Sequence, residues 1–312
     1  MKKVYLTEEI HQIAVDYLKE HVEVIEGERT DEEYILEKAA DCSAILIRSA
    51  KITRNIMQSI PKLEVVAKHG VGVDNIDLSA AKELGIRVVN APNSNINAVA
   101  EHSLMLILAL AKHTVLMDSY TRNNKFFLRN SVPNIELKVK TLGLIGFGKI
   151  ARKLAQKVTG LEMRVVASDP FADVTLAKKM QVELMSQDEL LAASDFVSVH
   201  VPLIPSTVKM VNKEFLEKMK KNAYLVNASR GGVLDEAQLC AALENETIAG
   251  AGLDVFESEP PQADNRLFAM EQVVVSPHNA ALTEEALLAM AMDSATGVVD
   301  VLEGRTPKFQ VC

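Results

Sequence analysis

The sequence predicts an α/β protein built from two doubly wound domains, each with a parallel sheet. Short β-type runs alternate with amphipathic helical runs along most of the chain, as expected for a parallel sheet covered on both faces. A strand, a glycine turn and a helix start stand in mid-chain around Gly146, so the residues before them must form another unit. The length of 312 residues also exceeds one comfortable hydrophobic core.

In the first ninety residues, strands are predicted at 4–6, 22–25, 44–47, 63–66 and 87–89. Helical spacing covers residues 8–19, 31–40, 53–60 and 77–84. Thr7 and Asp77 are expected to start the first and last of these helices. Gly85 stands where the last one would end in the left-handed conformation.

Further along, a long helix is predicted at 98–120, with an irregular stretch at 123–137. Further strands are predicted at 141–145, 165–168, 196–199, 223–226, 249–255 and 273–275. Further helices are predicted at 188–193, 213–219, 235–243 and 284–302. Because the last helix lies beyond the last strand, we expect it to return to the first domain. The predicted domains are therefore 1–97 with 284–312, and an inserted domain at 98–283.

The composition predicts a globular protein without nucleic-acid, membrane or metal partners. A formal charge of −8 argues against a phosphate-binding surface, which needs clustered lysine and arginine. The three cysteines are widely spaced and show no metal-type pairing. No secretory leader is visible, and the longest apolar stretch, 104–111, is far shorter than the roughly 20 residues that span a bilayer. We expect a cytoplasmic location.

The glycine turn has the form expected of a dinucleotide-binding βαβ unit. Gly146 permits a tight turn, Gly148 allows close approach of a pyrophosphate to the helix start, and Ala151 keeps helix and strand close. Asp169 follows the second strand, where it would accept hydrogen bonds from ribose hydroxyls and repel a 2′-phosphate. The pattern favours NAD over NADP; a purely structural turn is the alternative.

Polar residues follow three later strands, at the sheet edge where α/β proteins bind ligands. Arg230 could hold a carboxylate through two parallel hydrogen bonds, or form only a helix-start ion pair. Asp254 and Glu259 follow the next strand, and either could be simple surface charge. His278 follows another strand, while His102, in the long helix, is expected to pack there. Reduction of a 2-oxo acid needs such a cation and a proton donor, and a nearby glutamate favours the protonated imidazole.

These residues resemble those of the D-isomer-specific 2-hydroxyacid dehydrogenases, most closely the phosphoglycerate dehydrogenase branch. The resemblance covers nearly the whole chain. It rests on the motifs at 68–77 (KHGVGVDNID), 89–92 (VNAP), 142–150 (LGLIGFGKI), 200–203 (HVPL), 227–232 (NASRGG), 253–260 (LDVFESEP) and 276–280 (SPHNA). It implies a Rossmann NAD-binding domain inserted in a flavodoxin-like substrate domain. Because long relatives carry a further C-terminal regulatory domain and this chain ends at Cys312, a short form is expected.

The resemblance also implies roles for individual residues. Arg230 would bind the substrate, His278 would be the general acid/base, and Glu259 would tune His278. The implied cofactor contacts are Gly146, Gly148, Lys149, Ile150, Asp169, Val201, Ala228, Ser229, Arg230, Asp254, His278 and Ala280. The implied substrate contacts are Arg48, Ser49, Lys68, Gly70, Val71, Gly72, Asn95 and Arg230, although Arg48 and Lys68 could merely line a solvated strand end.

The predicted function is NAD-dependent interconversion of a D-2-hydroxy acid and its 2-oxo acid, in a cleft between the domains. The predicted substrate is 3-phosphoglycerate. The alternatives are hydroxypyruvate, glyoxylate or another D-2-oxo acid, and a non-catalytic NAD-sensing protein. A homodimer is expected, with the aromatic stretch 124–129 and the apolar run 104–111 at its interface; a plain core helix is the alternative for 104–111.

Overall fold

The computed structural model describes residues 1–312 and divides into two compact units. Unit 1 consists of Met1–Asn95 and Ala281–Cys312, and unit 2 of Ile96–Ala280. Every strand pairing in both sheets is parallel. The predicted α/β class with two parallel sheets is therefore confirmed.

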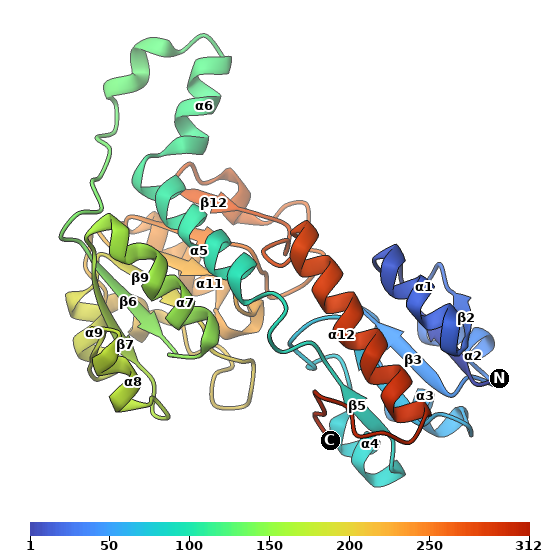
Figure 1. Ribbon diagram of the computed structural model, residues 1–312. Helices are drawn as coiled ribbons and strands as arrows, with labels where there is room; N and C mark the ends of the chain where they lie inside the picture. The colour runs from blue at the N-terminus through green and yellow to red at the C-terminus, as the bar shows by residue number, and fades with distance from the viewer. The chain divides into compact units, whose positions relative to one another are not determined.

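Unit 1 has a five-stranded sheet in the order β2-β1-β3-β4-β5. Its side chains alternate between faces: Val4 and Leu6 pack under α1 and α12, whereas Tyr5 packs on the face of α2, α3 and α4. Figure 1 shows α12 lying along the sheet beside α1. The elements are β1 Lys3–Leu6, α1 Gln12–His21, β2 Glu23–Glu26, α2 Glu32–Lys38, β3 Ala44–Ile47, α3 Arg54–Ser59, β4 Val65–Lys68, α4 Leu78–Leu84, β5 Arg87–Val89 and α12 Glu284–Leu302.

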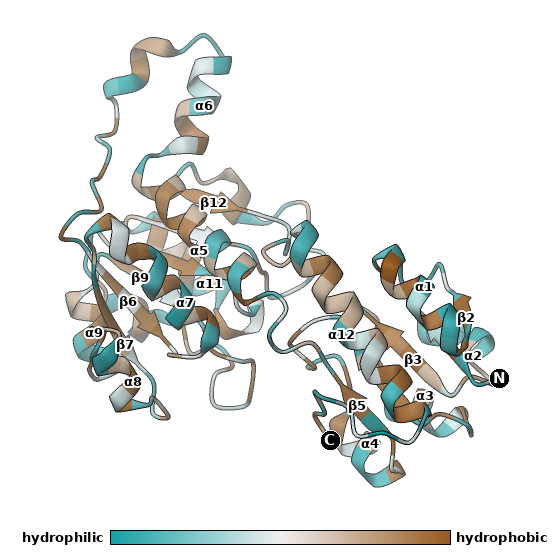
Figure 2. Ribbon diagram, viewed as in Figure 1, coloured by the Kyte–Doolittle hydropathy of each residue, from teal (hydrophilic) through white to brown (hydrophobic).

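Unit 2 has a seven-stranded sheet in the order β12-β11-β10-β9-β6-β7-β8. Figure 2 shows its central strands as predominantly hydrophobic, as buried parallel strands require. The strands are β6 Thr141–Ile145, β7 Arg164–Ser168, β8 Glu183–Leu184, β9 Phe196–Val199, β10 Tyr224–Asn227, β11 Gly250–Leu253 and β12 Val273–Val275. The α-helices are α5 Ile96–Ala111, α6 Thr114–Arg122, α7 Lys149–Val158, α8 Val174–Lys179, α9 Gln187–Ala193, α10 Lys213–Glu217 and α11 Glu236–Glu244.

Two predicted helix boundaries are confirmed and one is wrong. Asp77 caps α4 by accepting a hydrogen bond from the Ala80 amide, and Gly85 ends this helix with φ 70°. The first helix, however, begins at Gln12 with His11 as its N-cap, not at Thr7. Thr7 is fully buried, and its hydroxyl donates to Glu8 instead of capping a helix.

The single long helix predicted at 98–120 is also wrong, because the chain breaks into α5 and α6 at His113. This residue adopts the left-handed conformation, with φ 48°, which interrupts the helical hydrogen bonds. The stretch 123–137, predicted to be irregular, contains the 3₁₀ helix η1, Phe126–Asn130. The elements α8 and β8 were not predicted, since neither carries a strong apolar period.

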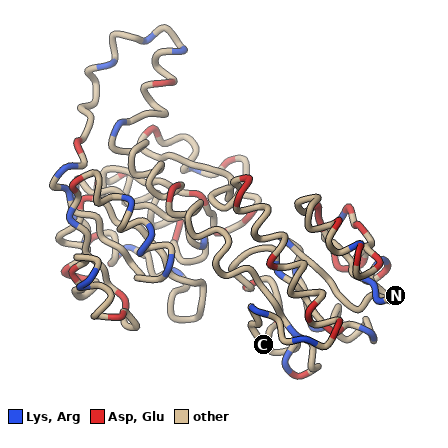
Figure 3. Tube along the Cα trace, viewed as in Figure 1, with Lys and Arg blue, Asp and Glu red and all other residues tan.

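The helix α6 and the 3₁₀ helix η1 contain no buried residue. Figure 1 shows both projecting from the sheet of unit 2. The largely buried α5 is joined to α6 across a 60° bend, and only this bent pair has the length and apolar composition of a membrane span; no single helix does. Figure 3 shows basic and acidic residues interspersed along each unit, and some are paired, such as Lys157 with Glu101 at 2.7 Å.

Candidate active site

The glycine turn after β6 has no room for a side chain at its first position. Gly146 has φ 89°, and a Cβ there would lie 2.6 Å from the carbonyl oxygen of His200. At Gly148, the N-cap of α7, a Cβ would meet nothing within 4 Å, so the space in front of the backbone is open. The first turn of α7, with Lys149 and Ile150, therefore offers helix N-terminal amides to an anion.

Asp169 follows β7 directly and is fixed beside this turn. One carboxylate oxygen accepts from the Phe147 amide at 2.7 Å, and the other accepts from the Phe171 amide at 2.8 Å. Val201 lies over the turn, since its Cγ1 would be 3.1 Å from a Cβ on Gly146. The narrow turn, the open helix start and the adjacent carboxylate fit a dinucleotide with a free ribose diol.

Arg230 stands in the loop after β10, which close backbone packing holds in place. The Asn227 side chain donates from Nδ2 to the Arg230 backbone carbonyl at 3.1 Å, and its Oδ1 accepts from the Ser229 backbone amide and hydroxyl. A Cβ on Gly231 would lie only 1.8 Å from the Phe256 carbonyl oxygen. The loop that carries Arg230 therefore packs directly against the loop that leads to Glu259.

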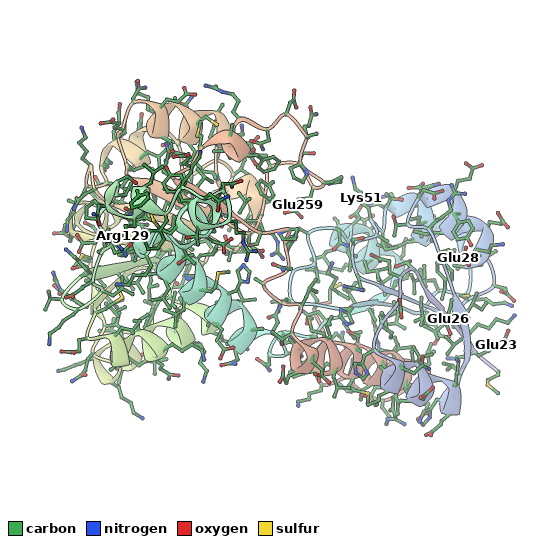
Figure 4. The ribbon with its side chains drawn as sticks, turned by 90° about the horizontal axis from the view of Figure 1, so that it is seen from above. Glu23, Glu26, Glu28, Lys51, Arg129 and Glu259 are labelled. Carbon is green, nitrogen blue, oxygen red and sulfur yellow. The ribbon has the colours of Figure 1, made fainter.

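His278 and Glu259 form a pair at the ends of neighbouring strands. Nδ1 of His278 lies 2.6 Å from Oε2 of Glu259, while Oε1 accepts from the Phe256 amide at 3.1 Å. Burial raises the pKa of Glu259, but its hydrogen bond and attraction to His278, with the Phe256 amide and Arg230, leave that pKa below its usual value. Figure 4 labels Glu259 on a loop of unit 2.

Asp254 lies beneath this pair with its side chain fully buried. Its Oδ1 accepts from the Ser276 hydroxyl at 2.6 Å and from the Asn279 amide at 3.0 Å, and its Oδ2 accepts from the Ala280 amide at 3.0 Å. The backbone carbonyl of Asp254 accepts from the His278 amide at 2.7 Å. Asp254 therefore fixes the segment on both sides of His278, which has the uncommon φ of 49°.

His102 completes this network, and no pattern in the sequence indicated its contact with Asp254. Its Nε2 lies 2.8 Å from the Ser276 hydroxyl and 3.3 Å from Oδ1 of Asp254. Burial raises the pKa of Asp254, but the hydrogen bonds from His102, Ser276 and two amides outweigh it and leave the pKa below its usual value. The expectation that His102 only packs within α5 is therefore wrong.

The substrate residues predicted in unit 1 lie at the ends of β3 and β4. The amides of Arg48 and Ser49 and the Ser49 hydroxyl donate to Glu8, and Nη1 of Arg48 donates to the Glu9 carbonyl at 3.1 Å. Nζ of Lys68 donates to the Arg48 carbonyl and, at 3.1 Å, to Oδ1 of Asn75. Arg48, Ser49 and Lys68 therefore belong to one hydrogen-bonded group.

The glycine loop after β4, residues 70–72, is held through its carbonyl groups by Asn90 and Ala91. The Ala91 amide donates to the Gly70 carbonyl at 2.9 Å, and the Asn90 side chain donates to the Val71 carbonyl at 2.7 Å. These bonds engage the carbonyl groups of the loop and fix its backbone.

Two polar atoms near this loop are buried without a partner, Nε2 of His69 and Oδ1 of Asn95. Burial lowers the pKa of His69 to about 4, so its imidazole is neutral at ordinary pH.

The fold and the site of unit 2 define an NAD-binding α/β protein. Residues 104–280 match the family model described as the D-isomer specific 2-hydroxyacid dehydrogenase, NAD binding domain. The chain belongs to this family.

Relatives and solved structures agree with this assignment. The chain is 40% identical over 306 residues to D-3-phosphoglycerate dehydrogenase of Archaeoglobus fulgidus, covering 97% of this chain and 58% of that protein. It resembles the crystal structure of the TT0316 protein of Thermus thermophilus with a TM-score of 0.93, 32% identity and coverage of 99% and 100%. It also resembles D-lactate dehydrogenase with NAD+ from Lactobacillus jensenii, with a TM-score of 0.83, 26% identity and full coverage of both chains. The chain spans about half the length of the curated relatives it matches.

Proposed function

We propose that this protein is an NAD-dependent D-2-hydroxyacid dehydrogenase. The observation that carries the proposal is the 2.6 Å contact between His278 and Glu259, in the domain that also holds Arg230 and the dinucleotide turn. A surface ion pair alone would not need the fully buried Asp254 network that holds the His278 backbone. A binding protein that only senses NAD would need neither the paired histidine nor Arg230.

Each of the three residues has a distinct role in the proposed reaction. Arg230 binds the substrate carboxylate as a planar fork and turns the 2-oxo group toward His278. His278 donates its Nε2 proton to the carbonyl oxygen during reduction and accepts it back during oxidation. Glu259 accepts from Nδ1, which orients the ring and stabilises the charged imidazolium. NADH, when bound, supplies the hydride that C2 of the substrate receives.

The proposed cofactor contacts lie in unit 2. The amides of Lys149 and Ile150 would meet the pyrophosphate beside Gly146 and Gly148, and Asp169 would accept from the adenosine ribose. Further contacts are proposed at Val201, Ala228, Ser229, Asp254 and Ala280. Because the Asp254 side chain is fully buried, it would act on the nicotinamide end of the cofactor through the 276–280 segment, whose backbone it holds.

The proposed substrate is a small D-2-hydroxy acid, with 3-phosphoglycerate first because the curated relatives carry the name D-3-phosphoglycerate dehydrogenase. Further substrate contacts are proposed among the residues of unit 1. The backbone amides of Val71 and Gly72 suit an anion, and Arg48, Ser49, Lys68, Gly70 and Asn95 would contribute. Hydroxypyruvate and glyoxylate are the alternatives, and a similar solved structure with 25% identity is that of a glyoxylate reductase.

A homodimer and a cytoplasmic location are further proposals. The projecting segment of α6 and η1 exposes several large apolar side chains, and Phe127 is 91% exposed. Arg129, labelled in Figure 4, stacks its guanidinium 5.0 Å from the Phe126 ring centre in the same segment. Such a surface is typical of a protein interface. Sedimentation of the Phe127→Ser variant tests it, since a monomer is expected where the unchanged protein is a dimer.

The activity is tested by the oxidation of a D-2-hydroxy acid with NAD+, followed through the absorbance of NADH. Turnover of the D but not the L isomer is expected, with NADP+ much weaker than NAD+. NADH binding without turnover of any 2-oxo or 2-hydroxy acid, in either direction, would favour the sensing protein instead.

A further inference from the structure

A second carboxylate, that of Glu236, holds the loop that carries Glu259. Glu236 is the first residue of α11, and its Oε1 accepts from the Glu257 backbone amide at 2.6 Å. Its Oε2 accepts from the Asn265 side chain at 2.9 Å. In return, the Glu236 backbone amide donates to the Glu257 side chain at 2.9 Å. One side chain therefore binds both ends of the loop 257–265.

This loop has no hydrophobic anchor of its own. None of the residues 257–265 is buried, whereas Phe256, directly before them, is buried. A segment without buried apolar side chains is held mainly by its hydrogen bonds, and it opens readily when they are lost. The position of Glu259 within the loop therefore depends on polar contacts such as those of Glu236.

Glu236 and Glu259 bind two consecutive backbone amides. The Phe256 amide donates to Oε1 of Glu259 at 3.1 Å. The next amide, that of Glu257, is the one that donates to Glu236. The carbonyl oxygen of the same peptide group packs against Gly231, where a Cβ would lie only 1.8 Å from it. Because the C=O and N–H of a trans peptide point in opposite directions, this peptide is held on one side by packing and on the other by Glu236.

Lys209 offsets the repulsion between the neighbouring carboxylates. Its Nζ lies 3.2 Å from Oε1 of Glu257 and 3.4 Å from Oδ2 of Asp235, the N-cap residue of α11. A cation at this distance lowers the electrostatic cost of placing Glu236 beside Glu257. The paired hydrogen bonds between Glu236 and Glu257 can therefore form while both side chains are charged.

We propose that Glu236 is a positioning residue, which keeps the Glu259 carboxylate in contact with His278. This inference rests on the proposed function, since it gives Glu236 a part in the reaction of that enzyme. Glu236 acts through the backbone of Phe256 and Glu257, and it neither donates nor accepts the proton of the reaction.

The first test is the kcat for 2-oxo acid reduction in Glu236→Ala. It should fall about tenfold, the effect of one charge-assisted hydrogen bond lost, while the KM for NADH stays within about twofold. Glu236→Gln should keep kcat within about threefold of the unchanged protein, because its amide oxygen can still accept from the Glu257 amide. Glu244→Ala is the matched control on the same helix: it removes the same charge and a partly exposed ion pair with Arg266, and kcat should stay within about twofold.

An unchanged kcat in Glu236→Ala would overturn the inference, and so would an equal loss in Glu244→Ala. If Glu236→Ala folds poorly, Glu236→Asp replaces it, since it keeps the charge at the helix start but has a shorter reach. A loss of about threefold in kcat is then expected, and an unchanged kcat contradicts the inference.

A double variant distinguishes positioning from general stabilisation. Glu236→Ala combined with Glu259→Ala should be within about twofold of Glu259→Ala alone, because Glu236 acts through the carboxylate that this second change removes. A further tenfold loss of kcat in the double variant would show that Glu236 acts independently of Glu259, and it would contradict the inference.

A measurement without turnover separates this inference from the proposed function. Hydrogen exchange of the amides of residues 255–258, followed by mass spectrometry, should be faster in Glu236→Ala than in the unchanged protein or in Glu244→Ala. Equal exchange in all three proteins contradicts the inference, even if the unchanged protein reduces a 2-oxo acid. Absence of turnover by the unchanged protein rejects the proposed function instead, and faster exchange in Glu236→Ala would then still show that Glu236 holds the loop.

Discussion

Nδ1 of His278 lies 2.6 Å from Oε2 of Glu259, and the two side chains are 47% and 36% exposed. A carboxylate at Nδ1 fixes the tautomer and leaves Nε2 to exchange a proton. Because the His278 side chain is partly exposed, a substrate can reach its imidazole. The pair therefore combines orientation, charge stabilisation and access.

Replacing Glu259 by Gln should slow 2-oxo acid reduction. The pKa of Glu259 is below its usual value, so its carboxylate is negatively charged at neutral pH and stabilises a positive charge on His278. Without that charge, kcat at neutral pH should fall by roughly 10- to 100-fold. Steady-state NADH oxidation measures this loss. Glu257→Gln, on the same loop, should keep most of the activity; an equal loss there would assign the effect to general charge.

Replacing Arg230 by Lys should reduce kcat/KM for 2-oxo acids by about 100-fold, because an ammonium group cannot form two parallel bonds to a carboxylate. The affinity for NADH, measured by fluorescence titration, should change much less. Comparable losses in both quantities would show that Arg230 supports the cofactor loop and does not bind substrate.

Replacing Asp169 by Asn should relax the choice between NAD and NADP. The carboxylate would repel a 2′-phosphate, and the amide would not, although its NH₂ group would meet the Phe147 or Phe171 amide. The preference for NAD, as a ratio of kcat/KM values, should fall by about tenfold. An unchanged ratio would place the cofactor's ribose elsewhere.

Replacing His102 by Leu should destabilise the protein by about 1–3 kcal/mol, because the fully buried Asp254 carboxylate loses a donor. Urea unfolding measures this free energy. His21→Leu is a suitable control, since His21 pairs with Glu303 at 3.0 Å on a partly exposed surface, where the expected loss is about 0–1 kcal/mol. Equal losses in the two variants would remove the special role of the Asp254 network.

Acidification should destabilise the unchanged protein more than the Glu8→Gln variant. The folded pKa of Glu8, about 2, is below its unfolded value, so its stabilisation is present above the unfolded pKa and is lost as pH falls toward 2. Between pH 7 and pH 3, the two unfolding free energies should converge by on the order of 1 kcal/mol, allowing for partial exposure. If the unfolding free energies of the two proteins kept the same difference between pH 7 and pH 3, the low pKa of Glu8 would be contradicted.

Local sequence signals predicted the elements that local interactions determine. Asp77 caps α4 and Gly85 ends it, as the side-chain acceptor and the missing Cβ require, and α12 spans the predicted residues 284–302. The glycine turn was also recognisable, because its steric demand is local to Gly146 and the strand that precedes it.

Long-range contacts explain what the sequence could not predict. Thr7 looked like a helix start, but its hydroxyl is taken by Glu8 and the helix begins later. His102 and Asp254 are 152 residues apart, and only the packing of α5 beside β11 joins them. No period or motif marks a contact of that kind. The same holds for Glu8 and Ser49, which meet because β1 and β3 are adjacent.

The His278→Asn variant, assayed for NADH oxidation with a 2-oxo acid and for NADH binding in the same preparation, tests the proposed chemistry most directly. Asparagine can replace the hydrogen bond to Glu259 but cannot donate a proton near neutral pH. Turnover should fall by at least about 100-fold while NADH affinity stays within a few fold. Turnover near that of the unchanged protein would contradict the role of His278 as the proton donor.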